Sequence, residues 1–127
     1  MTGERILVVE DNEKNMKLFR DVLNATGYRT LEATTGSEAI DMASEHAPDL
    51  VLMDIQLPDL DGVQALHRLR AGLRTATIPV LALTAQAMQG DRERFLAAGF
   101  DGYLSKPVDV RELIETVREH CDGARDG

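Results

Sequence analysis

Apolar positions along this chain follow two alternating patterns. Five short runs are apolar or rich in β-branched residues, as expected for strands that a sheet buries on both faces; they are residues 6–9, 29–33, 50–53, 80–83 and, more weakly, 102–105. In the segments that follow these runs, apolar residues mostly recur at helical spacing. Strands that alternate with helices in this way predict an α/β fold, with a parallel sheet covered by helices on both faces.

Polar caps and glycines mark the ends of the expected helices. The first helix is expected over about 14–25 and ends before Gly27. The second helix is expected to begin at Thr35 or Gly36, and the third at Gly62. Asp91 is expected to cap the fourth helix and Gly99 to end it, and Asp109 to cap the fifth. Five strand–helix units in 127 residues fit one domain with a flavodoxin-like, doubly wound (βα)5 sheet in the order 2-1-3-4-5. The strand order is an inference from this fold class.

Four of the expected strands end in polar residues. Glu10 and Asp11 follow the first strand, Asp54 the third, Thr84 the fourth and Lys106 the fifth. In open parallel sheets, ligands bind beyond the carboxyl ends of the strands, near the point where strand order reverses. Each residue alone has an ordinary structural explanation, such as a helix cap, a turn or a surface charge. Together they predict a site in which three carboxylates, a hydroxyl and an amine meet.

Three neighbouring carboxylates need compensation. Like charges a few ångströms apart repel by about 4 kcal/mol at an effective dielectric constant near 20, so such a cluster raises its pKa values or takes up a cation. Lys106 could neutralise one carboxylate, and Mg²⁺ suits the others because it binds carboxylates, keeps several waters and recruits phosphate oxygens. No His/Cys set has zinc spacing; His46, His67 and His120 lie on expected helices away from this edge.

The same groups are those that phosphoryl transfer requires. A metal ion and a lysine neutralise the phosphoryl oxygens, and a hydroxyl donates a hydrogen bond to one of them. A carboxylate can act as the nucleophile and form an aspartyl phosphate. Asp54 is the candidate nucleophile because it follows the central strand and has partners on both sides.

These residues stand in segments that resemble the receiver domain of bacterial two-component response regulators, the CheY-like superfamily. The matching segments occur in the family's order: ILVVEDN at 6–12, LVLMDIQLPDLDG at 50–62, IPVLALTA at 78–85 and YLSKP at 103–107. The resemblance covers about residues 4–121. Within the family, VEDNEKNMKLF and MDIQLPDLDG are most similar to small stand-alone receivers of the DivK type.

The resemblance implies a role for each site residue. Asp54 would be the phosphoacceptor and, with Asp11, a direct ligand of Mg²⁺. Glu10 would assist the metal through a water molecule, and the backbone carbonyl of Gln56 would be a further ligand. Lys106 would contact the phosphoryl group.

The resemblance also implies a conformational switch. Thr84 would move to bond the phosphoryl group, and Tyr103 would change between outward and inward rotamers. The loop at 85–90 would transmit the change, and the Lys106–Pro107 peptide bond would be cis. A histidine kinase or phosphotransfer protein would be the phosphodonor and meet the first helix. A downstream protein would bind the face of the fourth helix, fifth strand and fifth helix around Tyr103.

Composition narrows the partners and the compartment. The net charge of −8 disfavours nucleic acid, because phosphates are bound by Lys and Arg. No apolar run approaches the ~20 residues of a membrane helix, and the first apolar run is too short for a signal peptide. One cysteine is compatible with a reducing compartment. We therefore expect a cytoplasmic protein without nucleic-acid or membrane partners. The composition does not distinguish a monomer from a weak dimer.

Three alternatives compete with this interpretation. A Mg²⁺-dependent phosphatase of the haloacid dehalogenase type needs a second acid two residues after its nucleophile, where this chain has Gln56. An FMN binder needs a Ser/Thr/Gly-rich loop after the first strand, where this chain has Glu10, Asp11 and Asn12, an acidic sequence that would repel phosphate unless a metal ion is bound. We therefore expect no enzyme, beyond catalysis of its own phosphoryl transfer and dephosphorylation.

The third alternative is a receiver domain excised from a longer response regulator or hybrid kinase. The chain begins with Met1, and only 122–127 follow the matching region. We expect a single receiver domain over 1–127 with a short tail and no output domain.

Overall fold

Five strands and five helices alternate along the chain in the computed structural model, which describes residues 3–85 and 91–126. In chain order they are β1 (Arg5–Val9), α1 (Glu13–Ala25), β2 (Arg29–Ala33), α2 (Gly36–His46), β3 (Leu50–Asp54), α3 (Gly62–Ala71), β4 (Val80–Thr84), α4 (Asp91–Ala98), β5 (Gly102–Ser105) and α5 (Val110–Asp126). The strands form one parallel sheet in the order β2-β1-β3-β4-β5, which confirms the predicted topology.

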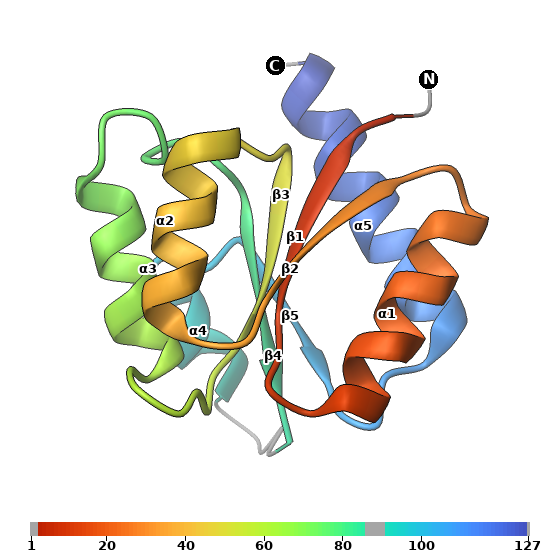
Figure 1. Ribbon diagram of the computed structural model, residues 1–127, viewed down its shortest axis with the longest axis horizontal. Coiled ribbons are helices and arrows are strands. Elements are labelled where there is room, and N and C mark those ends of the chain that lie inside the picture. Colours follow the sequence, from red (N-terminus) through yellow and green to blue (C-terminus); the bar gives the residue numbers. More distant parts are fainter. Residues whose placement is uncertain (1–2, 86–90, 127) are drawn as a thin grey trace.

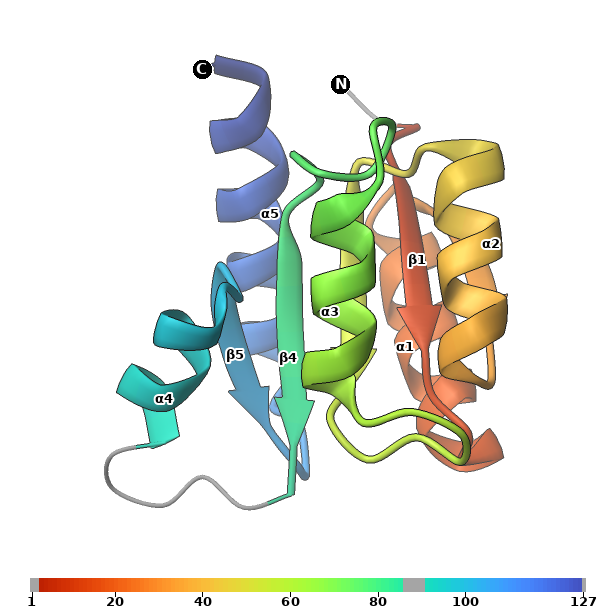
Figure 2. The same cartoon turned by 90° about the vertical axis from the view of Figure 1, so that its left-hand side faces the viewer.

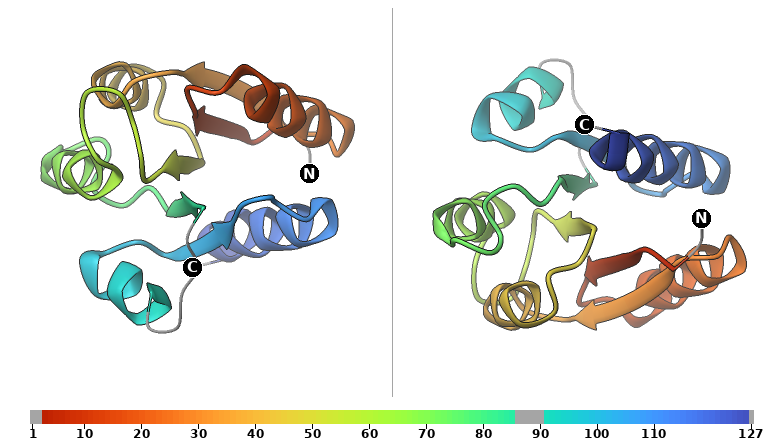
Figure 3. Two further views of the ribbon diagram at one scale, coloured as in Figure 1. Left: turned by 90° about the horizontal axis from the view of Figure 1, so that it is seen from below. Right: turned by 90° about the horizontal axis from the view of Figure 1, so that it is seen from above.

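The sheet separates two apolar cores. Helices α1 and α5 cover one face, and α2, α3 and α4 cover the other (Figures 1 and 3). Because successive strand side chains point to opposite faces, Leu7 and Val9 of β1 join the core under α2–α4, whereas Ile6 and Val8 join the core under α1 and α5. This burial on both faces explains why the central strands are continuously apolar.

Side-chain caps begin α1, α2 and α3. Asn12 accepts a hydrogen bond from the Asn15 N–H at 3.0 Å and caps α1. Thr35 caps α2 by accepting from the Glu38 N–H, and Asp61 caps α3 in a reciprocal capping box. These caps satisfy N–H groups that have no partner within the helix.

Two glycines follow the ends of α1 and α4, as predicted. Gly27 has φ +97° and Gly99 has φ +114°. Residues with a side chain rarely adopt this left-handed region, so glycine is favoured directly after a helix.

Some boundaries differ from the prediction. Strands β3 and β4 each extend one residue further, to Asp54 and Thr84, because backbone pairing continues whatever the side chain's polarity. Helix α5 continues beyond the region of family resemblance, as far as Asp126. Residues 86–90 of the predicted transmitting loop lie outside the described residues. Within the described ranges, no helix is long and apolar enough to cross a bilayer.

Candidate functional site

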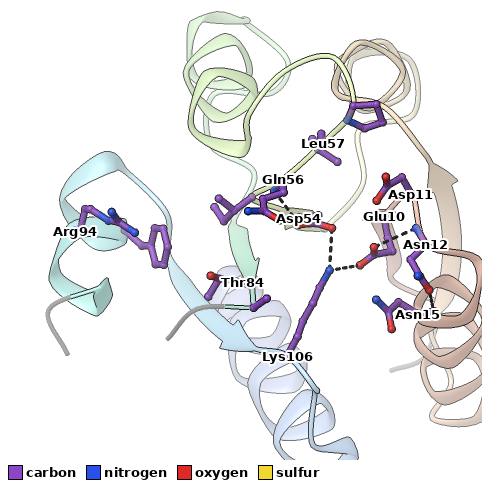
Figure 4. Close-up of a pocket in the computed structure, with 14 residues that line it drawn as sticks. Glu10, Asp11, Asn12, Asn15, Asp54, Gln56, Leu57, Thr84, Arg94 and Lys106 are labelled. Carbon is purple, nitrogen blue, oxygen red and sulfur yellow. Dashed lines mark hydrogen bonds and ion pairs between the residues drawn. The ribbon is translucent and has the colours of Figure 1, made fainter. Parts of the chain in front are cut away.

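The predicted site residues lie together at one edge of the sheet. The strands are parallel and their carboxyl ends share this edge (Figure 2). The ladder pairs Val9 with Met53, one residue before Glu10 and Asp54, so the first and third strands deliver their acids side by side. Glu10, Asp11, Asp54, Thr84 and Lys106 all line one cleft of about 420 Å³ (Figure 4). The structure thus brings together all four polar strand ends.

Lys106 joins two of the carboxylates. Its Nζ lies 2.8 Å from Asp54 Oδ2 and 2.7 Å from Glu10 Oε1 (Figure 4). The side chains of Lys106, Asp54 and Glu10 are only 18%, 8% and 1% exposed, so these ion pairs are largely shielded from water. The Lys106 N–H donates to the Thr84 carbonyl at 2.7 Å, and the Lys106–Pro107 peptide bond is cis.

Burial and charge act on both ends of this network. Burial raises the pKa of the Glu10 carboxyl above 4.5; the bond from Lys106 opposes this rise, and the Asp54 charge adds to it. For Lys106, burial alone would lower the pKa, but the bonds to Asp54 and Glu10 outweigh it, so its pKa lies above 10.5. The ammonium therefore stays charged at neutral pH. Among the described residues that line the cleft, the carboxylates are Glu10, Asp11 and Asp54 and the cations are Lys106 and Arg94.

Oxygen ligands for a metal ion converge beside this network. Glu10, Asp11 and Asp54 each offer a carboxylate oxygen, and these oxygens lie within 4.8 Å of one another. Asn12 supplies the cap of α1, so Asp11 is not used as the helix cap and its exposed carboxylate lines the cleft. An all-oxygen set of carboxylates at an open cleft fits a hard cation such as Mg²⁺.

The Asp54 carboxylate is held at both oxygens. Asp54 Oδ1 accepts a hydrogen bond from the Gln56 N–H at 2.9 Å, and Oδ2 accepts from Lys106. The chain then turns tightly, because the Gly62 N–H donates to the Ile55 carbonyl at 2.8 Å. A Cβ on Gly62 would lie 2.8 Å from Ile55 Cα, so only glycine fits where α3 begins. The loop between Asp54 and α3 is thereby closed at its base.

The two predicted switch residues occupy different places. Thr84 is buried at the end of β4 and lines the cleft. Tyr103 lies outside the cleft lining, on β5, where it is partly buried. Its ring packs beside the Phe95 ring, with centroids 6.1 Å apart, and Phe95 does line the cleft. Phe95 therefore stands between the cleft and Tyr103.

The sequence analysis missed several residues of the cleft wall. Asn15, Leu57, Pro58, Arg94 and Phe95 also line the cleft. Asn15 lies one helical turn after Asn12, so helical spacing from the acid pair could have found it. Arg94 (Figure 4) and Phe95 reach the cleft because α4 packs beside β5, and their local sequence carries no signal of this.

Similarity to known proteins agrees with this geometry. A family model described as the response regulator receiver domain matches residues 6–118. The polar-differentiation response regulators DivK of Brucella ovis and Brucella anthropi are each 48% identical over 119 residues, which cover 94% of this chain and 97% of theirs.

Solved structures extend the similarity. One is the receiver domain of sensor histidine kinase PA1611 from Pseudomonas aeruginosa PAO1, which has a magnesium ion coordinated in its active site cleft. It is 39% identical in sequence, and it superposes with a TM-score of 0.87 over 95% of this chain and 99% of that one. A putative response regulator from Chloroflexus aurantiacus is 30% identical, with a TM-score of 0.89 over the same shares. The matching family model, the DivK relatives and the shared fold show that the chain belongs to the response regulator receiver domain family.

Proposed function

We propose that this protein is a phosphorylation-dependent signalling switch that accepts a phosphoryl group on Asp54. The observation that carries the proposal is the position of Asp54, whose carboxylate lies at an open cleft, in contact with the Lys106 ammonium and close to the acids Glu10 and Asp11. This arrangement supplies a nucleophile, a fixed positive charge and a place for a divalent cation around one reaction centre.

The metal site would be built from oxygen ligands. Asp11, Asp54 and the backbone carbonyl of Gln56 would hold Mg²⁺ directly, and Glu10 would contribute through a water molecule. When bound, the ion supplies positive charge that offsets the carboxylates and the incoming phosphoryl oxygens. The magnesium ion in the cleft of the P. aeruginosa receiver domain supports this assignment.

Asp54, Lys106 and Thr84 would carry out the phosphoryl transfer. A carboxylate oxygen of Asp54 attacks the phosphorus of a phosphohistidine; the O–P bond forms as the P–N bond breaks, and the imidazole leaves with that electron pair. The Lys106 ammonium, held charged by its raised pKa, neutralises a phosphoryl oxygen. The Thr84 hydroxyl, at the neighbouring strand end, donates a hydrogen bond to another oxygen.

The phosphodonor in this proposal is a histidine kinase or a phosphotransfer protein. The relatives support this class, since they are named as response regulators and as a receiver domain of a sensor histidine kinase. Output would occur by protein contact through the face of α4, β5 and α5, around Tyr103. In this role the protein works in the cytoplasm and acts catalytically only on its own phosphoryl group. Gln56, two residues after Asp54, lacks the acid that a phosphatase for external substrates would need.

Acetyl phosphate with Mg²⁺ provides the test. We expect the parent protein to gain one phosphoryl group, which peptide mass spectrometry locates on the peptide that contains Asp54. Asp54→Asn should gain none, while Asp41→Asn, an exposed change on α2, should be modified like the parent. Full modification of Asp54→Asn would overturn the proposal.

A further inference from the structure

The loop that follows Asp54 is tied to a helix that contributes nothing to the cleft lining. Asp59 Oδ1 accepts a hydrogen bond from the Gly36 N–H at 2.7 Å, and Asp59 Oδ2 accepts from the Ser37 N–H at 3.0 Å. These donors form the start of α2. A carboxylate at a helix N-terminus binds unpartnered N–H groups and the positive end of the helix dipole. Asp59 therefore joins the loop at 55–61 to α2.

The contact is closely packed as well as hydrogen-bonded. Gly36 is buried, and a Cβ added there would lie 3.0 Å from Leu60 Cβ and 3.3 Å from Asp59 Oδ1. The loop tip and the first residue of α2 thus approach as closely as a glycine permits. In addition, α2 packs along α3, the helix into which the loop leads (Figures 1 and 2).

The same loop carries a proposed metal ligand. Gln56 lies at the loop base, where its N–H donates to Asp54 Oδ1 at 2.9 Å and a β-bridge pairs it with Asp61. Between these two positions the chain runs out to Asp59 and back. The Gln56 backbone is therefore held in place by the Asp54 carboxylate before it and by the loop after it, whose tip is bound to α2.

We propose that Asp59 is a positioning residue for the metal site: by binding the start of α2, it holds the loop so that the Gln56 carbonyl stays in place for Mg²⁺. This inference rests on the proposed function, because it concerns that metal site. Mg²⁺ demands near-ideal octahedral geometry, so a small displacement of one ligand weakens binding. Groups that orient metal ligands typically contribute ten- to a hundredfold in affinity.

Asp59→Ala and Asp59→Asn test the inference. Amide chemical shifts followed during Mg²⁺ titration, well below the unfolding temperature of each variant, give the dissociation constant. Because Asp59 acts one contact away from the ligand, we expect Asp59→Ala to weaken Mg²⁺ binding about three- to tenfold, less than direct support of a ligand would. Asp59→Asn should lie between it and the parent, because the amide oxygen accepts one of the two hydrogen bonds.

A matched control is Asp49→Ala. Asp49 is also exposed and also accepts a backbone N–H, from Arg5 at 2.8 Å, but it lies at the amino end of β3. Its removal should leave the Mg²⁺ dissociation constant unchanged. Phosphorylation by acetyl phosphate gives a second readout: the Asp59→Ala rate should reach the parent rate at saturating Mg²⁺, since the nucleophile and Lys106 are untouched. A general loss of stability would not shift only the Mg²⁺ dependence.

The outcomes separate this inference from the proposed function. If Asp11→Ala abolishes Mg²⁺ binding but Asp59→Ala binds as tightly as the parent, the positioning role is wrong and the metal site stands. Equal weakening by Asp59→Ala and Asp49→Ala would also overturn the positioning role. If Asp11→Ala leaves binding unchanged, the metal site itself is misassigned. Should Asp59→Ala not fold, Asp59→Asn decides, and parent-like Mg²⁺ binding by it overturns the inference.

Discussion

Lys106 Nζ lies 2.8 Å from Asp54 Oδ2, although the two residues are 52 positions apart in the sequence. The same nitrogen lies 2.7 Å from Glu10 Oε1, so one ammonium bridges the ends of β1, β3 and β5. Two poorly exposed carboxylates thus share the Lys106 ammonium. The network that would serve phosphoryl transfer is also part of what holds this edge of the sheet together.

Replacing Lys106 by methionine should destabilise the metal-free protein. The change leaves Asp54 and Glu10 close together without their cation. Breaking a fully buried pair costs about 3–5 kcal/mol. Lys106 is partly exposed, so we expect a loss of about 1–3 kcal/mol in the free energy of unfolding by urea at pH 7. Lys17→Met, which breaks an exposed pair with Asp21, should cost much less, because solvent screens an exposed pair. Equal losses of unfolding free energy in the two variants would show that the Lys106 bridge contributes no more than an exposed ion pair.

Mg²⁺ should stabilise the unphosphorylated protein against heat. An ion that binds only the folded state raises the unfolding temperature as its free concentration exceeds the dissociation constant, roughly with the logarithm of concentration. Asp11→Ala should remove most of this effect because it deletes an exposed ligand without disturbing the Lys106 bridge. Thermal melts over a Mg²⁺ series measure it, with Asp41→Ala as the control. An Asp11→Ala protein stabilised as strongly as the parent would mean that the acids do not form the site.

The Asp59 contact predicts a pH dependence. Hydrogen bonds from the Ser37 side chain and the Gly36 N–H lower the pKa of Asp59 from 3.8 to about 2. Because the folded-state pKa lies below the unfolded value, its contribution to stability is fully present above about pH 4 and is lost as pH falls toward 2. The melting temperatures of the parent and Asp59→Asn should therefore differ by a constant amount from pH 7 to about 5 and converge at lower pH. A difference that persists unchanged into acid would show that the Asp59 charge is irrelevant.

Local patterns predicted the five strands and their polar ends, because both depend on burial and on the common edge of a parallel sheet, whereas the strand order was inferred from the fold class. Lys106 illustrates this: alone it resembles a surface charge, yet its place after β5 puts it beside Asp54. By contrast, Asp59 and its partner Gly36 on α2 are 23 positions apart in the sequence, and their contact depends on the path of the loop at 55–61. The contact between Phe95 and Tyr103 depends on how α4 packs. Side-chain periodicity does not determine either relationship.

The structure gives the proposed switch a physical route. Thr84 and Phe95 line the same cleft, and the Phe95 ring packs between that cleft and Tyr103, with an edge contact to Phe100 at 6.1 Å. A displacement of Thr84 toward a phosphoryl group would change the shape of the cleft wall that Thr84 and Phe95 share. Since Tyr103 is partly buried against the same core, it would respond to that change.

Thr84→Ala should therefore separate phosphorylation from the switch. A charge-assisted hydrogen bond from Thr84 to a phosphoryl oxygen is worth about 1.5–3 kcal/mol, enough to shift a two-state equilibrium about tenfold to a hundredfold if it forms in one state only. Without the hydroxyl, Asp54 can still accept the phosphoryl group beside Lys106, but the active state no longer gains this hydrogen bond. Amide chemical shifts with and without beryllofluoride should show a clear change at Phe95 and Tyr103 in the parent and a much smaller one in Thr84→Ala. Thr77→Ala, an exposed change before β4, should behave like the parent. Equal shift changes at Tyr103 in the parent and in Thr84→Ala would show that Thr84 does not couple the cleft to the α4–β5–α5 face.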